Sequence, residues 1–108
     1  MANALIVDAP PTMFDDFAAI LEATGYRCSQ KSSGSMVRGI RRKDTATYEI
    51  THGSTRVDVA MERRLGNRTM FIAVIPTRSS FGRRDDSSDE LAEQIVELLV
   101  TNGADDSA

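Results

Sequence analysis

The chain contains one cysteine and one histidine, Cys28 and His52, the side chains best suited to nucleophilic chemistry. A cysteine nucleophile needs a neighbouring base, so these two residues would have to meet in the fold. The surrounding polar residues predict that both lie in loops. Ser54 and Asp58 follow the histidine, yet no nucleophile-elbow pattern surrounds the serine. A solvated histidine and an unreactive thiol are the simpler interpretation, and the sequence favours a protein that is not an enzyme.

Metal and cofactor sites have weaker support. One histidine and one cysteine fall short of the three or four protein ligands that zinc usually takes. Asp85-Asp86 and Asp89-Glu90 lack the spacing of a calcium loop and are better explained as acids at the start of a helix. The sequence has no Gly-x-Gly-x-x-Gly and no phosphate-binding Gly-Lys-Ser/Thr loop. We therefore expect no metal and no cofactor.

Positive charge is confined to the middle of the chain, between Arg27 and Arg84. That span holds all 13 Lys and Arg and four acids, which gives +9, while the flanks hold 12 acids and no base. The candidate anion ligands divide between an expected open sheet face and the loop after it: Arg38, Arg41, Lys43 and Arg56, then Arg78, Arg83 and Arg84. Such side chains bind phosphate and supply most non-specific nucleic-acid affinity. Nucleic-acid or other polyanion binding, with Phe71 stacking on a base, is therefore the alternative function.

The same charges also have a structural interpretation. Glu49, Asp58 and Glu62 are expected on the same sheet face, where they can pair with the arginines across strands. Charged edge strands also discourage aggregation. The net charge is −3, whereas a nucleic-acid-binding domain is usually basic overall. The sequence leaves open whether these arginines are paired or free.

Two amphipathic helices are expected to flank the basic segment. The first spans about 12–24, with Thr12 as N-cap and acids in its first turn. The second runs from Ser87, which has capping-box spacing to Glu90, to about residue 101. Its apolar arc exceeds half the circumference and contains Leu91, Ala92, Ile95, Val96, Leu98, Leu99 and Val100.

Four strands are expected between the helices, after a polar loop over 27–35. Their ranges are about 36–43, 45–51, 55–63 and 69–75. Alternation in the first strand is imperfect, and a bulge near Gly39 would restore it. Turns at His52–Ser54 and Gly66-Asn67 make the connections short, and short connections favour antiparallel pairing.

The predicted fold class is therefore α+β, a four-stranded antiparallel meander with both helices packed on one face. We expect an N-terminal segment over 1–11, a single domain over 12–102 and a disordered acidic tail over 103–108. Whether Leu5–Val7 adds an edge strand is left open. The lone cysteine excludes an internal disulfide, and no signal-like or membrane-spanning stretch is evident. A cytoplasmic protein with no membrane partner is expected.

The wide apolar arc of the second helix and the two apolar faces of the last strand suggest a surface for another protein. Its candidate residues are Phe71, Leu91, Val96 and Val100. The helix–meander–helix order resembles the secretion-chaperone-like α/β domains over residues 12–101, and that resemblance implies dimerisation and protein binding. A non-catalytic module for protein interaction or self-association is therefore the leading expectation.

Overall fold

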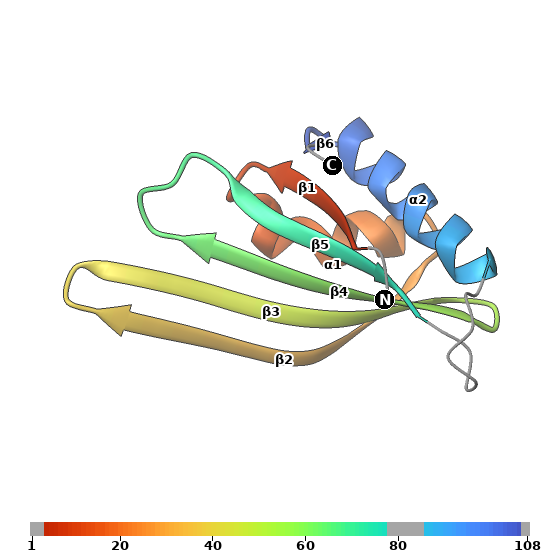
Figure 1. Cartoon of the computed structure of the whole chain (residues 1–108), viewed down its shortest axis with the longest axis horizontal. Coiled ribbons are helices and arrows are strands. Elements are labelled where there is room, and N and C mark those ends of the chain that lie inside the picture. Colours follow the sequence, from red (N-terminus) through yellow and green to blue (C-terminus); the bar gives the residue numbers. More distant parts are fainter. Residues whose placement is uncertain (1–3, 78–85, 107–108) are drawn as a thin grey trace.

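The computed structural model describes residues 4–77 and 86–106 and shows one sheet with two helices (Figure 1). The helices are α1 (Met13–Ala23) and α2 (Asp86–Thr101). The strands are β1 (Leu5–Ala9), β2 (Arg27–Arg38), β3 (Arg41–His52), β4 (Thr55–Arg64), β5 (Met70–Pro76) and β6 (Asp105–Asp106). The predicted α+β class and antiparallel sheet are confirmed. No helix in the described ranges is long and apolar enough to cross a membrane.

The sheet has more strands than the four that the sequence predicted. Its order is β2-β3-β4-β5-β1-β6, with five longer strands and the two-residue β6 at one edge. β1 pairs with β5 in a register that aligns Val7 with Ile72, and it pairs with β6 on its other side. Because β1 lies inside the sheet, both of its edges are paired, and the apolar run Leu5–Val7 is a structural strand rather than a separate N-terminal segment.

The largest correction concerns residues 27–38. The predicted loop over 27–35 is in fact most of β2, and Gly39 forms part of the two-residue turn from β2 to β3 rather than a bulge. Its positive φ of 61° suits that turn, because glycine adopts such angles without strain. The irregularity in β2 lies between Gln30 and Ser32. Apolar and polar residues do not alternate in residues 27–35, because β2 is an edge strand exposed on both faces, so this pattern could not predict the strand.

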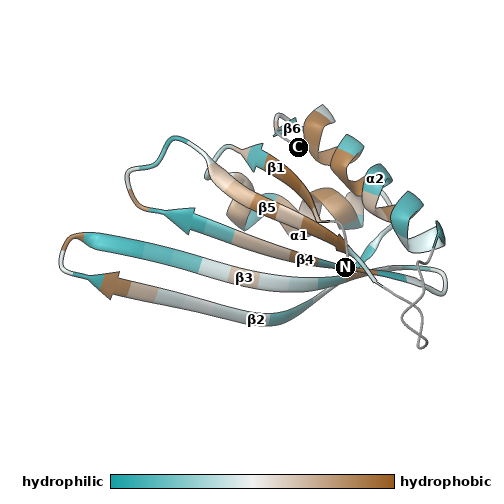
Figure 2. Cartoon of the chain, viewed as in Figure 1, coloured by the Kyte–Doolittle hydropathy of each residue, from teal (hydrophilic) through white to brown (hydrophobic). Residues whose placement is uncertain are grey.

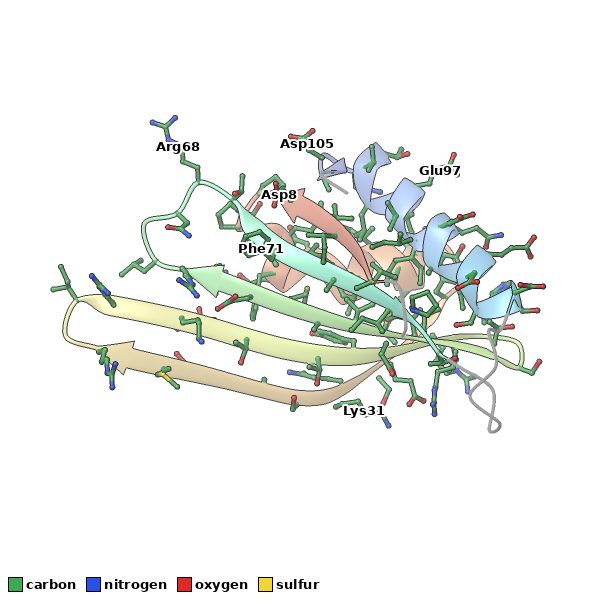
Figure 3. All side chains as sticks on the ribbon, viewed as in Figure 1. Asp8, Lys31, Arg68, Phe71, Glu97 and Asp105 are labelled. Carbon is green, nitrogen blue, oxygen red and sulfur yellow. The ribbon has the colours of Figure 1, made fainter. Side chains whose placement is uncertain are left out.

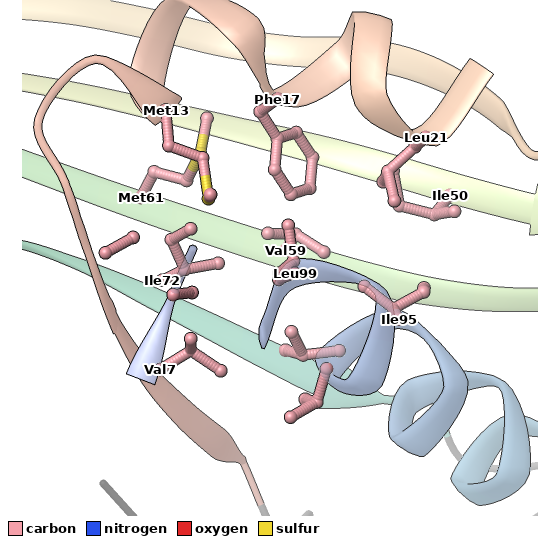
Figure 4. Close-up of a cluster of buried hydrophobic side chains, with 14 of the residues drawn as sticks. Val7, Met13, Phe17, Leu21, Ile50, Val59, Met61, Ile72, Ile95 and Leu99 are labelled. Atoms are coloured by element: carbon pink, nitrogen blue, oxygen red, sulfur yellow. The ribbon is translucent and has the colours of Figure 1, made fainter. Parts of the chain in front are cut away.

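The buried side chains of both helices meet the same group of strand residues (Figure 4). From α1, Phe17 and Leu21 are fully buried, and the Phe17 ring lies 5.3 Å from the ring of Tyr48 on β3. From α2, Ile95 and Leu99 reach the same core. The helix boundaries agree with the predicted ranges to within one residue, because periodic apolar positions mark a buried helix face.

The C-terminal segment is partly built into the sheet. Ala104 is buried, and Asp105–Asp106 pair with Val7 and Asp8 of β1. The predicted disordered tail over 103–108 is therefore wrong for these residues, while 107–108 lie outside the described residues. Pairing with β1 supplies backbone hydrogen bonds that the local sequence does not predict.

Candidate functional site

One end of the sheet combines cations with a hollow. We use "basic tip" for the end of the β2–β3 hairpin together with the start of the β4–β5 loop. This end projects beyond α1 (Figure 1), and the first residues of β3 form a strongly hydrophilic segment there (Figure 2). The hollow has a volume of about 420 Å³ and is lined by Met36, Arg38, Arg41, Arg42, Lys43, Arg64, Leu65 and Asn67. Five of these eight residues are cations and none is an acid.

Two cations at the tip have no acidic partner in the described part of the chain. Arg38 and Arg41 are opposite each other in the register, one on each side of the turn. Lys43 and Arg64 form the next outer-face pair between β3 and β4, and both reach Glu62, at N–O distances of 3.5 and 3.2 Å. Among the described residues the charge at the tip is thus only partly neutralised, and the uncompensated cations there are Arg38 and Arg41.

The basic tip also carries exposed apolar side chains. Met36, Val37, Ile40 and Leu65 are between 62% and 93% exposed, and the highest value belongs to Ile40 in the turn. Met36 and Val37 are consecutive in β2, so they point to opposite faces of the hairpin. No large buried cluster surrounds them, because α1 and α2 cover the other end of the sheet (Figure 1).

Arg56, another predicted anion ligand, is not part of the hollow. Arg56 pairs with Glu49 at 3.6 Å, and Lys31 reaches the same carboxylate at 3.4 Å. The expected cross-strand pairing with an arginine therefore occurs for Glu49. Glu62 instead pairs with Lys43 across strands and with Arg64 in its own strand, and Asp58 has no ion pair among the described residues. The predicted loop ligands Arg78, Arg83 and Arg84 lie outside the described residues.

A hydrogen-bonded carboxylate supports the base of the tip on the inner face. Asp44 accepts hydrogen bonds from Ser35 at 2.8 Å, from Arg63 at 2.9 Å and from Arg42 at 3.0 Å. These donors lower the pKa of Asp44 to about 2, because each favours the ionised carboxylate. No sequence pattern marks this cluster. Its members come together only when β2, β3 and β4 are in register.

Cys28 and His52 contact different groups in the structure. The Cys28 Sγ donates to the Ala18 carbonyl at 4.0 Å, whereas the His52 ring packs 5.3 Å from the ring of Tyr26. Burial, with a smaller contribution from Glu22, raises the pKa of Cys28 to about 11. The thiol is therefore protonated at neutral pH and is a weak nucleophile. Within residues 4–77 and 86–106, no group of three or more His, Cys, Asp or Glu is placed to hold a metal ion.

A second candidate surface is the free edge of β2. The backbone carbonyl of Arg42 accepts a hydrogen bond from the Leu65 amide, which lies on the β4 side. The N–H and C=O groups of Arg42 therefore point away from β2. Its partner Val37 therefore belongs to a pair without mutual hydrogen bonds. Because such pairs alternate along an antiparallel ladder, Val37, Ser35 and Ser33 direct their N–H and C=O groups to the open edge.

The predicted apolar interaction residues divide between core and surface. Leu91 and Val96 are 3% and 7% exposed and pack inside the chain, so they do not offer a surface. Phe71 is 54% exposed on the outer sheet face, near Asp8 (Figure 3), and Val100 on α2 is 41% exposed. Comparison of the chain with protein-family models, curated proteins and solved structures found no match.

Proposed function

We propose that the chain is a non-catalytic, cytoplasmic binding module that joins another protein, or a second copy of itself, by strand addition along β2. The observation that carries this proposal is the open edge of that strand. β2 is 12 residues long, lies at the end of the strand order and is exposed at every residue except the half-buried Cys28. An unpaired strand edge is a template for an extended segment of another chain.

The part of the edge best suited to pairing is Ser32–Arg38. The irregularity between Gln30 and Ser32 interrupts the strand on one side, and the turn at Gly39 ends it on the other. Between them the register with β3 is regular, and the segment contains no proline. Its side chains are mostly small, so a partner backbone can approach within hydrogen-bonding distance.

The free backbone groups give the proposal a specific test. Proline at position 33 removes an N–H that points to the open edge, and the ladder with β3 loses no hydrogen bond there. Ser33→Ala, which keeps the N–H, is the matched control. If the partner is a second copy, sedimentation velocity of the wild-type and Ser33→Ala chains should show mass rising with concentration, while Ser33→Pro stays monomeric.

A different protein partner gives a different result in a second measurement. Affinity capture with the wild-type chain and with Ser33→Ala should retain a specific protein that Ser33→Pro fails to retain. The proposal is wrong if the wild-type chain is monomeric at the highest concentration and Ser33→Pro captures the same proteins. Thermal unfolding of both variants checks that any loss of binding does not come from loss of the fold.

A further inference from the structure

We infer that the basic tip also binds a double-stranded nucleic acid, which it contacts through the phosphate backbone. The hollow at the tip shares Met36 and Arg38 with the β2 edge, but nucleic-acid binding would use side chains, whereas strand addition uses the backbone groups of that edge. The hollow is lined by Arg38, Arg41, Arg42, Lys43 and Arg64 and by no acidic residue. A row of cations around a depression raises the local concentration of a polyanion more than isolated surface charges do.

The arginines at the turn have the chemistry that a phosphate ligand requires. Arg38 and Arg41 face each other across the hairpin and have no ion pair among the described residues. Binding there breaks no existing ion pair, and each guanidinium can fork onto two phosphate oxygens. Lys43 and Arg64 share Glu62, so their two positive charges are opposed by one negative charge. The outer face of the tip keeps a surplus of positive charge.

The shape of the tip fits a groove. The last residues of the β2–β3 hairpin extend past the end of β4 as a short two-stranded tip (Figure 1), because β4 pairs with β3 only as far as Lys43. The major groove of DNA admits a two-stranded ribbon. The acids of α2 lie at the other end of the molecule, where Glu97 points into solvent (Figure 3). A duplex held at the tip would therefore be distant from this acidic helix. This separation reconciles a polyanion site with a net charge of −3.

The apolar side chains favour a nucleic acid over a lipid surface. A membrane-bound segment presents its apolar residues on one face, whereas Met36 and Val37 point to opposite faces of β2. Ile40 stands alone at the apex of the turn and is 93% exposed. It lies in the turn between Arg38 and Arg41, so the most exposed apolar side chain of the tip has a cation on either side of it in the sequence.

The test is a fluorescence anisotropy titration of a labelled duplex of about 20 base pairs with the full chain, at about 50 to about 200 mM KCl. The key variant is Arg38→Gln with Arg41→Gln. The matched control is Lys31→Gln with Arg56→Gln, which removes the same charge from outer-face cations that pair with Glu49. All four positions are exposed, so both variants should keep the fold, as circular dichroism can verify.

The expected result is binding that weakens as salt rises. The tip variant should lose affinity on the order of tenfold or more at low salt, and the magnitude of its salt slope should fall by about 2, because each phosphate contact contributes about 0.9. The control should bind like the wild type. The inference is overturned if no duplex binds at about 50 mM KCl or if both variants weaken binding equally. Binding to phosphatidylserine vesicles without binding to the duplex overturns it in favour of a lipid partner.

Discussion

Arg63 donates two hydrogen bonds to one oxygen of Asp44, from Nη2 at 2.9 Å and from Nε at 3.3 Å. The pair joins β4 to β3 at the base of the basic tip. Arg63 also reaches Asp15 at 3.2 Å and lies 4.5 Å above the ring of Phe14, so the same side chain ties the sheet to α1. The projecting hairpin is thus anchored to the body of the protein by one arginine of β4 that contacts both β3 and α1.

The ionisation of Asp44 should make the free energy of unfolding depend on pH. Its pKa is about 2 in the folded chain against an ordinary value of 3.8, so the charged carboxylate favours the folded state. This contribution is complete above about pH 4 and is lost as the pH falls through 2. Asp44→Asn should be less stable than the wild type in urea unfolding at pH 7, and the difference should narrow between pH 4 and 2. If the stability difference between the wild type and Asp44→Asn stayed constant down to pH 2, the lowered pKa of Asp44 would be contradicted.

Two phenylalanines offer a matched comparison of the core and the outer face. Phe17 is fully buried against Tyr48, and Phe17→Ala should cost about 3–5 kcal/mol in the free energy of unfolding because it leaves a cavity. Phe71 is 54% exposed, and Phe71→Ala should change stability by about 0.5 kcal/mol or less. Denaturant unfolding measures both. Equal losses of stability in the two variants would mean that Phe71 is buried and that the outer face is covered.

Ser88 joins α2 to the ends of two strands. Its hydroxyl accepts a hydrogen bond from the Thr77 amide at 2.7 Å and donates to the Arg56 carbonyl at 2.8 Å, and the residue is fully buried. Ser88→Ala leaves the Thr77 amide without this acceptor and should destabilise the fold by about 1–3 kcal/mol. The exposed Ser29→Ala is the control. Thermal unfolding measures both variants, and equal midpoint temperatures for Ser88→Ala and Ser29→Ala would refute the role of Ser88.

The thiol of Cys28 should react slowly in the folded chain. With a pKa of about 11 instead of 9.0, its thiolate fraction at pH 8 is about 100-fold lower than that of an ordinary cysteine. Alkylation by iodoacetamide at pH 8 should therefore be slower in the native chain than in the urea-denatured chain. The native rate should keep rising with pH up to about 11. Equal native and denatured rates would show that the thiol is exposed and unperturbed.

The elements that sequence patterns predicted well are those with one buried face. The periodic apolar residues of α1 and α2 fixed both helices, because only a buried stripe requires that spacing. Strand β4 alternates cleanly for the same reason, and its turn at Gly53 was placed correctly. Leu5–Val7 was too short to classify alone, since its role depends on pairing with β5 and β6.

The candidate sites depended more strongly on tertiary structure. By itself the sequence determined where positive charge occurs along the chain and that Glu49 and Glu62 would share a face with cations. Only the fold showed that residues 27–35 form an exposed edge strand, because such a strand buries neither face and leaves no alternation to detect. Likewise, only the register decided which cations are neutralised, since Arg63 meets Asp44 across a hairpin while Arg38 and Arg41 meet each other at its end. Ion pairing depends on distances between strands, and those distances are set by the sheet rather than by spacing along the chain.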